Sequence, residues 1–313
     1  MPQSAVTQRR EDAAHALDSR DASFWWDLIA RILVFTGGFS VILFITSIFI
    51  FIAMQGMGFA VNPSNWEQFL TSAAWRPSYE EAPQYGALYL ILGTASITLC
   101  AMALAVPLSI GSAIYISEFA QGRSKEWLKV IIELLAAIPS VVWGMIGMLV
   151  FAPIITWLFD IEFGLTLLNA GIVLGLMAAP IMTTLAEDAL KAVPESYREA
   201  AEALGATRWQ VVWRVVMPHA RPGLSGAVLL GVGRAVGETM AVLMVAGGSI
   251  RLPTSPLEPV SALTATIASE MPETAKGDEH YQALFTLGIL LFMITFVINF
   301  LADRIIRGRR SKR

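Results

Sequence analysis

Residues 199–218 read EAAEALGATRWQVVWRVVMP, and they join two long apolar segments of the chain. Although this stretch is a connection, it has the pattern of two helices. Residues 196–204 are predicted to form the first helix, and Gly205 suits the left-handed conformation that commonly ends one. Thr207 and Gln210 have the spacing of a capping box, which indicates the start of the second helix. We name this helix–bend–helix segment the elbow.

The second helix of the elbow has an apolar face. Trp209, Val212, Trp213 and Val216 recur at the spacing that places side chains on one side of a helix. Pro218 is predicted to end this helix, because proline lacks the backbone N–H that the next turn needs. Such a helix can lie in the lipid interface, where tryptophan is favoured. It can also dock into a groove on a soluble partner. The pattern alone leaves both interpretations open.

Outside the elbow the chain is strongly apolar. Of its 313 residues, 55% are hydrophobic and 15% are charged, and the mean hydropathy is +0.60. This composition excludes an ordinary soluble protein. Six segments have the roughly 20 residues that are needed to cross a bilayer as a helix. The predicted fold is therefore an all-α integral membrane protein with spans at residues 29–54, 87–116, 128–151, 164–188, 223–248 and 282–303.

The basic residues give these spans an orientation. Eighteen of the 22 lysines and arginines lie in the N-terminal region, after the second and fourth spans, or at the C-terminus. Basic residues favour the cytoplasmic side, so we expect both termini to be cytoplasmic. We expect a mobile cytoplasmic tail (residues 1–28), a first span (29–54) and an outer loop (55–86). A core (87–303) that contains the elbow region (193–219) and a basic C-terminus (304–313) follow.

The two long outer connections, residues 55–86 and 249–281, are rich in proline and acidic residues. They can cover the external mouth of a pathway and receive a soluble partner, or they can be simple linkers. The sequence holds no phosphate-binding loop of the form GxxxxGK[ST], so the chain is not expected to bind ATP itself. Its three histidines lack metal-ligand spacing, and the single cysteine, Cys100, excludes an intrachain disulfide. We expect no catalytic residue, no metal site and no enzyme activity.

The fifth expected span contains two charges, in the stretch GVGRAVGETM at residues 231–240. Arg234 lies about 16 Å into this span at roughly 1.5 Å per residue, near mid-membrane. Glu238 follows four positions later and would share its helix face. A charge at that depth costs at least about 2.5–3.5 kcal/mol, so both groups should face protein or a water-filled cavity. The pair can neutralise itself and fix helix packing. Alternatively, Arg234 can offer its planar donors to a passing oxyanion while Glu238 orients it.

The elbow resembles a known family. Glu199-Ala200-Ala201, then Gly205 after three residues, then Val215-Val216-Met217-Pro218 after nine more, is similar to the EAA loop of binding-protein-dependent ABC importers. The resemblance implies that the elbow docks into a cleft of an ATP-binding subunit. Glu199 would be the polar anchor, the alanines would allow close approach, and Gly205 would make the bend. The residues expected at this contact are Glu199, Ala200, Ala201, Gly205, Trp209, Trp213 and Pro218.

The stretch around Arg234 resembles the fifth-span signature of the Pst phosphate-importer permeases, and the likeness extends over residues 85–305. Met240 after Glu238-Thr239 is more similar to the PstC-like than to the PstA-like permeases. The resemblance implies a type I ABC importer permease fold in the bacterial inner membrane. It also implies a substrate pathway at Arg234, Gly237, Glu238 and Thr239.

The implied partners are a PstA-like second permease, two PstB-like ATP-binding subunits that hold ATP and Mg, and an extracytoplasmic PstS-like phosphate-binding protein. Membrane lipid surrounds the chain, and no nucleic acid is implied. Three alternatives remain. The importer could carry another oxyanion, such as molybdate, sulfate or phosphonate. The chain could be a scaffold that signals phosphate status. It could be an ion-driven transporter, although the elbow argues against this.

Overall fold

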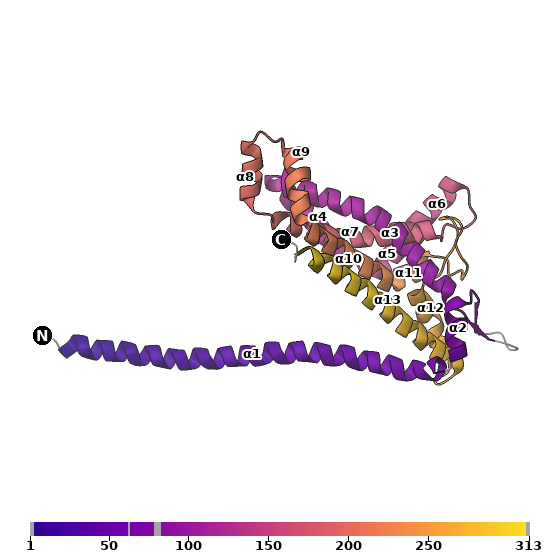
Figure 1. Cartoon of the computed structure of the whole chain (residues 1–313), viewed down its shortest axis with the longest axis horizontal. Helices are drawn as coiled ribbons and strands as arrows, with labels where there is room; N and C mark the ends of the chain where they lie inside the picture. Colours follow the sequence, from indigo (N-terminus) through magenta and orange to yellow (C-terminus); the bar gives the residue numbers. More distant parts are fainter. Residues whose placement is uncertain (1–2, 62, 78–82, 311–313) are drawn as a thin grey trace. The chain divides into compact units, whose positions relative to one another are not determined.

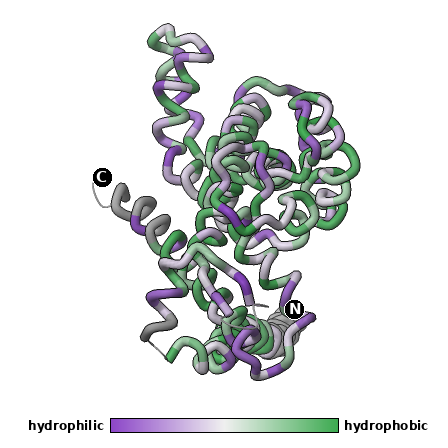
Figure 2. The backbone as a smooth tube through the Cα atoms, turned by 90° about the vertical axis from the view of Figure 1, so that its right-hand side faces the viewer, coloured by the Kyte–Doolittle hydropathy of each residue, from purple (hydrophilic) through white to green (hydrophobic). Residues whose placement is uncertain are grey.

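The computed structural model of the chain describes residues 3–61, 63–77 and 83–310 (Figure 1). Nearly all regular structure in these residues is helical, which confirms the all-α prediction; the strands β1 (Trp75–Arg76) and β2 (Gln84–Tyr85) have two residues each. Hydrophobic residues run along most of the backbone, and hydrophilic ones form short patches (Figure 2). The chain divides into two units, residues 1–54 and 55–313.

The first unit belongs to one long helix, α1 (Gln3–Ala60). Its apolar stretch begins at Phe24, and most side chains from there to Met54 are exposed. An apolar helix with no buried face needs lipid or a partner around it. The segment expected to be a tail has a helical backbone from Gln3 onward. The physical reason is that residues 3–36 contain neither glycine nor proline, so nothing interrupts the helix.

The second unit is built around α3 (Leu88–Ile114) and α7 (Leu167–Lys191), which pack along each other. α10 (Met217–Gly237) packs against both, and α13 (Glu279–Arg310) packs against α10. Small and aliphatic side chains fill the shared core, among them Ile97, Ala101, Ala105, Val173, Leu174, Met177, Ala178 and Met182. The alanines let the helix backbones approach closely, as is common between membrane helices.

The third expected span is displaced along the chain. α4 (Gly122–Ala137) ends before Pro139, and a new helical stretch runs from Ser140 to Phe159, comprising α5 (Ser140–Ile146), a π-helical turn and α6 (Ala152–Phe159). Ile138 has an extended backbone, with ψ of 124°, because the residue before a proline disfavours the helical conformation. The prediction of one helix over residues 128–151 is therefore wrong.

The fifth expected span is broken. α10 ends at Gly237, Glu238 is extended, and a short helix α11 (Met240–Val245) follows. Among the described residues, five helices are long and apolar enough to cross a membrane: Phe24–Ala60, Leu88–Phe119, Ser140–Phe159, Leu167–Lys191 and Glu279–Phe300. Residues 223–248 instead form a discontinuous segment. Glycine-rich sequence weakens the helix there, and side-chain hydrogen bonds replace the lost backbone ones.

At the end of the second unit opposite the elbow, β1 and β2 pair antiparallel with Trp75 facing Tyr85. We call residues 63–77 and 83–87, with α2 (Pro63–Thr71), the hairpin region. Its aromatic side chains share a core with α13 and α12 (Leu263–Glu270). After α11 the chain turns at Gly247, runs through a loop and returns at Val260, which bridges to Gly247. α12 therefore starts beside the broken segment and ends beside the hairpin region.

Candidate functional site: the elbow and the broken helix

The elbow has the local structure that the sequence predicts. α8 (Glu195–Ala203) ends before Gly205, whose φ is +80°, and α9 (Arg208–Val211) follows. The capping box is present: the Gln210 backbone N–H donates to the Thr207 hydroxyl at 3.3 Å, and the Thr207 N–H donates to the Gln210 side-chain oxygen at 2.9 Å. Both contacts satisfy backbone donors that have no partner within the helix.

Pro218 does not end the second helix, contrary to prediction. The chain stays helical from Arg208 to Gly237, through a π-helical turn at Val212–Val216 that leads directly into α10 at Met217. A π turn shifts the hydrogen-bonding pattern by one residue, so the following proline is accommodated as at a helix start. The elbow therefore continues into the helix that carries Arg234 without a flexible joint.

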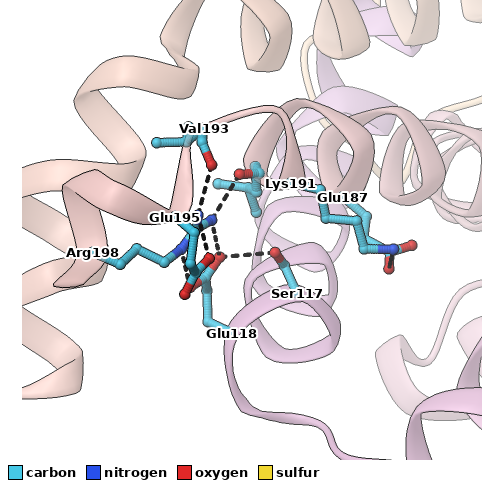
Figure 3. Close-up of polar contacts among 8 residues, drawn as sticks. Ser117, Glu118, Glu187, Lys191, Val193, Glu195 and Arg198 are labelled. Atoms are coloured by element: carbon cyan, nitrogen blue, oxygen red, sulfur yellow. Dashed lines mark hydrogen bonds and ion pairs between the residues drawn. The ribbon is translucent and has the colours of Figure 1, made fainter.

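The base of the elbow is held by Arg198, a residue that the sequence analysis missed (Figure 3). Its guanidinium contacts both carboxylate oxygens of Glu118, with Nε–Oε2 at 3.2 Å and Nη2–Oε1 at 3.1 Å. It also donates to the backbone carbonyls of Val193 at 2.7 Å and Leu190 at 3.0 Å, and pairs with Glu195 at 3.2 Å. The side chains of Arg198 and Glu118 are only 12% and 11% exposed. We call this set of contacts the Arg198 clamp.

The clamp ties α8 to the ends of α3 and α7. Burial lowers the pKa of Arg198, but the hydrogen bond and charge of Glu118, together with Glu195, outweigh it and raise the pKa above its ordinary value. Nothing in the spacing of Glu118 and Arg198, 80 residues apart, could indicate this pairing. A second set of ion pairs lies beside it: Glu187 of α7 pairs with Lys129 of α4 at 3.2 Å and with Lys191.

The residues predicted to contact an ATPase fall into two groups. On α8, Glu199 and Ala200 are exposed and Ala201 is half-buried, and Gly205 is exposed at the bend that follows. We call this surface the tip of the elbow. Leu204, which the sequence analysis did not select, is 90% exposed there. An aliphatic side chain this exposed, next to a carboxylate and small residues, is suited to contact with a protein partner.

Trp209 and Trp213 lie elsewhere. Their rings contact each other edge to face at 5.7 Å between centroids. Trp209 also lies 6.1 Å from the ring of Phe119, in the π-helical turn Tyr115–Phe119 that follows α3. Both are about half exposed and line an apolar groove of about 500 Å³ with residues of α3. The valines of the same segment, Val211, Val212 and Val216, are buried. The predicted apolar face is thus divided between the core and this groove.

Arg234 and Glu238 are not paired. Because the helix ends at Gly237, Glu238 leaves the helix face that it was predicted to share with Arg234. One Glu238 side-chain oxygen instead accepts from the Ala241 backbone N–H at 3.3 Å, which caps α11. The Glu238 backbone carbonyl accepts from the Thr264 hydroxyl of α12 at 2.7 Å. The prediction that both charges share one helix face is therefore wrong, and the Arg234–Glu238 ion pair, one of the two interpretations left open, is absent from the described structure.

Arg234 makes no hydrogen bond or ion pair with the described part of the chain, and its Nε atom is buried without a partner. Gly237 is exposed, and among the described atoms none lies within 4 Å of where a Cβ on Gly233 or Gly237 would be. Thr239 is half-buried, and its hydroxyl donates to the Gly237 carbonyl at 3.4 Å. The four predicted pathway residues thus lie at and next to the end of α10, where the guanidinium of Arg234 has no counter-charge in the described chain.

Known protein sequences are similar to this chain over most of its length. Residues 105–311 match the family described as "Binding-protein-dependent transport system inner membrane component". The "Probable ABC transporter permease protein YqgH" of Bacillus subtilis is 39% identical over 263 residues, covering 82% of this chain and 85% of that protein. The "Phosphate transport system permease protein PstC" of Haemophilus influenzae is 36% identical, covering 82% and 88%. The PstC of Mesorhizobium japonicum is 37% identical, covering 80% and 84%.

Solved structures show the same fold. A chain of a bacterial alginate ABC transporter, in complex with an alginate pentasaccharide-bound periplasmic protein, aligns with a TM-score of 0.63 at 18% identity, covering 92% of this chain and 96% of that one. An inward-facing methionine transporter, MetNI, aligns with a TM-score of 0.54 at 22% identity, covering 71% and 94%. The chain belongs to the family of binding-protein-dependent transport system inner membrane components, as a multi-pass inner-membrane permease subunit of an ABC importer related to PstC.

Proposed function

We propose that this chain forms half of the membrane pathway of an ATP-driven phosphate importer, with a homologous PstA-like permease as the other half. The observation that carries the proposal is the state of Arg234. Arg234 is half-buried with its Nε atom buried, and a guanidinium partly removed from water is normally paired, because an isolated charge is costly to desolvate. Arg234 has no counter-charge in the described chain, and nothing in that part of the chain crowds the neighbouring Gly233 and Gly237. A phosphate oxyanion would supply the missing counter-charge and accept paired, charge-assisted hydrogen bonds from Arg234.

The broken helix supports the same assignment. Discontinuous helices near the middle of a membrane commonly mark substrate sites in transporters, since irregular backbone is tolerated only where it lines a cavity. Gly237, Glu238 and Thr239 form such a break next to Arg234. We assign these four residues to the phosphate pathway, with Arg234 as the cation and Glu238 as the carboxylate that limits how tightly the anion is held.

The elbow would couple ATP hydrolysis by a partner subunit to movement of the permease helices. Its tip, with Glu199, Ala200, Ala201, Leu204 and Gly205, is the surface we assign to a PstB-like ATP-binding subunit, which would hold ATP and Mg and hydrolyse the nucleotide. The tryptophans and Pro218 instead belong to the stem of the elbow, which leads into α10. Movement of the tip would reach α3 and α7 through the Arg198 clamp and reach Arg234 through the unbroken helix.

The orientation follows from this assignment. The elbow and the basic termini would lie on the cytoplasmic side, and the hairpin region would face a PstS-like phosphate-binding protein outside. Phosphate released by that protein would pass Arg234 and leave toward the cytoplasm after ATP hydrolysis. The chain itself would carry out no covalent chemistry.

Reconstitution tests the proposal. The chain is assembled with its second permease and ATP-binding subunits in vesicles, and ATP-dependent uptake of labelled phosphate is measured against labelled sulfate and molybdate, with the binding protein added. We expect uptake of phosphate and little of the other two. Preferred uptake of sulfate or molybdate would assign the pathway to that oxyanion. A complex that binds its partners but transports none of the three would favour the signalling scaffold.

A further inference from the structure

The break between α10 and α11 frees several backbone acceptors, and one of them, the Glu238 carbonyl, has a partner on another helix. In a continuous helix, the Glu238 carbonyl would accept from the N–H four residues later. Because Glu238 is extended, with φ of −70° and ψ of 131°, that bond is not available to it. The Thr264 hydroxyl supplies the missing donor at 2.7 Å. Thr264 is 6% exposed, so water does not readily take its place.

Thr264 is held in place by both ends of α12. At the start of this helix, the Leu263 N–H donates to the Thr94 hydroxyl of α3 at 3.0 Å. At its end, Glu270 accepts from the Trp75 indole N–H at 2.9 Å and contacts the His280 Nε2 at 2.8 Å. α12 therefore connects the hairpin region, which carries Trp75, with the break beside Arg234. Eight residues of helix span roughly 12 Å, so α12 can transmit a displacement as one rigid piece.

The alternative to the break is a continuous helix. In that state the Glu238 carbonyl would bond within the helix and would no longer need Thr264. Glu238 would then lie four residues after Arg234 on the same face, where its carboxylate can pair with the guanidinium. The two states differ in one respect that matters for an anion: Arg234 is free in the broken helix and neutralised in the continuous one.

We propose that Thr264 holds the helix break open and that α12, positioned by its contacts with the hairpin region, thereby controls whether Arg234 is available to the transported anion. Displacement of α12 allows α10 and α11 to join. Glu238 then competes with the bound anion for Arg234 and promotes its release. This inference rests on the proposed function, because it assigns a control element to the same pathway. It makes Thr264 a positioning residue, since it acts on Arg234 only through Glu238.

A double-mutant cycle tests the inference. Thr264→Val keeps the shape of the side chain and removes the donor, so the break loses its partner and Arg234 becomes paired with Glu238. We expect phosphate uptake per assembled complex to fall about tenfold. In a Glu238→Gln background no carboxylate can neutralise Arg234, so adding Thr264→Val should change uptake less than threefold relative to Glu238→Gln alone. Non-additivity of this kind is the signature of two residues that act through one another.

Thr266→Val is the matched control. Thr266 lies in the same helix and is 2% exposed, but its hydroxyl contacts Ser261 at 3.0 Å and not the break. We expect uptake within twofold of the wild-type complex. Thr264→Ser, which keeps the donor, should behave likewise. An equal fall in uptake on adding Thr264→Val to the wild-type and Glu238→Gln backgrounds, or a Thr266→Val loss as large as that of Thr264→Val, would overturn the inference.

Hydrogen exchange gives a readout that does not depend on transport. Amide exchange over residues 236–242 of the assembled complex in detergent should be slower in Thr264→Val than in the wild type, because a continuous helix protects these amides. Thr266→Val should leave it unchanged. Unchanged or faster exchange in Thr264→Val would refute the control by Thr264 even if the wild-type complex transports phosphate. A wild-type complex without phosphate uptake would instead refute the proposed function, and the exchange result would still decide the role of Thr264.

Discussion

Two arginines of this chain are both partly removed from water, yet their surroundings are opposite. Arg198 at the elbow contacts the carboxylates of Glu118 and Glu195 and two backbone carbonyls. Arg234 beside the helix break contacts no acceptor in the described part of the chain. All five N–H groups of the Arg198 guanidinium donate to these carboxylates and carbonyls. Arg234 donates to no acceptor in the described chain, and the neighbouring Gly233 and Gly237 have open space around them.

The difference separates a structural arginine from a candidate ligand-binding one. A saturated, buried ion pair fixes the geometry of the elements that it joins, and removing one partner leaves the other charge without compensation. An unpaired guanidinium on a membrane-embedded helix is costly for folding and is retained where a ligand or a second subunit completes it. Loss of Arg198 should therefore be seen in stability, and loss of Arg234 in transport.

The largest effect is expected for Arg198→Ala. This change leaves the Glu118 carboxylate, 11% exposed, with the Ser117 hydroxyl as its remaining described partner. Breaking such a buried pair typically costs about 3–5 kcal/mol of unfolding free energy. The measurement is denaturant unfolding of the purified chain in detergent. Because the elbow loses its tie to α3 and α7, association with the ATP-binding subunit should weaken as well.

Arg214→Ala is the control for this prediction. Arg214 lies on the stem of the same elbow, is exposed, and makes no ion pair within the described residues. Removing an exposed charge usually changes stability by less than about 0.5 kcal/mol. If Arg198→Ala and Arg214→Ala have the same free energy of unfolding, the Arg198 clamp does not stabilise the elbow. Arg198 would then not be the structural arginine of the pair.

Arg234→Gln should act on transport instead. Loss of two charge-assisted hydrogen bonds, each worth about 1.5 kcal/mol at the low end, reduces the affinity of the pathway for phosphate roughly 100-fold. Uptake should fall accordingly, while the amount of assembled complex stays unchanged. Arg234→Lys keeps the charge without the planar fork, so we expect a smaller loss. A Gln variant that assembles poorly but transports normally per complex would make Arg234 a packing residue.

The elbow could be predicted from sequence because its signals are local. Gly205 and the Thr207–Gln210 capping box act over three or four residues, and the structure contains both. The Arg198 clamp could not be predicted, since it joins residues 80 positions apart and depends on how α3 and α7 pack. The local pattern also gave a wrong prediction at Pro218. A π-helical turn accommodates this proline, which would normally end a helix.

The residues that we propose for the pathway could be selected by type, but their arrangement could not be predicted. Arg234 and Glu238 stand out because charges are rare within membrane spans. Their i, i+4 spacing suggested a pair, but the donor that favours the break is Thr264, 26 residues further along the chain. Likewise, Pro139 placed a helix boundary inside the third expected span, which hydropathy averaged over a window does not resolve.

The smallest effect is expected at the bend itself. Gly205 has a φ of +80°, and no described atom lies within 4 Å of a Cβ built there, so Gly205→Ala costs only the strain of a left-handed backbone, about 1–2 kcal/mol. If the elbow tip docks on the ATP-binding subunit, this strain should weaken association several-fold, measurable by titrating that subunit against the permease complex. Gly277 has a φ of +87° in equally open space, in the loop before α13. Gly277→Ala therefore carries the same backbone cost, and we expect it to leave the association unchanged. Equal weakening by both variants would mean that each destabilises the permease in general. The bend at Gly205 would then have no specific role in binding the ATP-binding subunit.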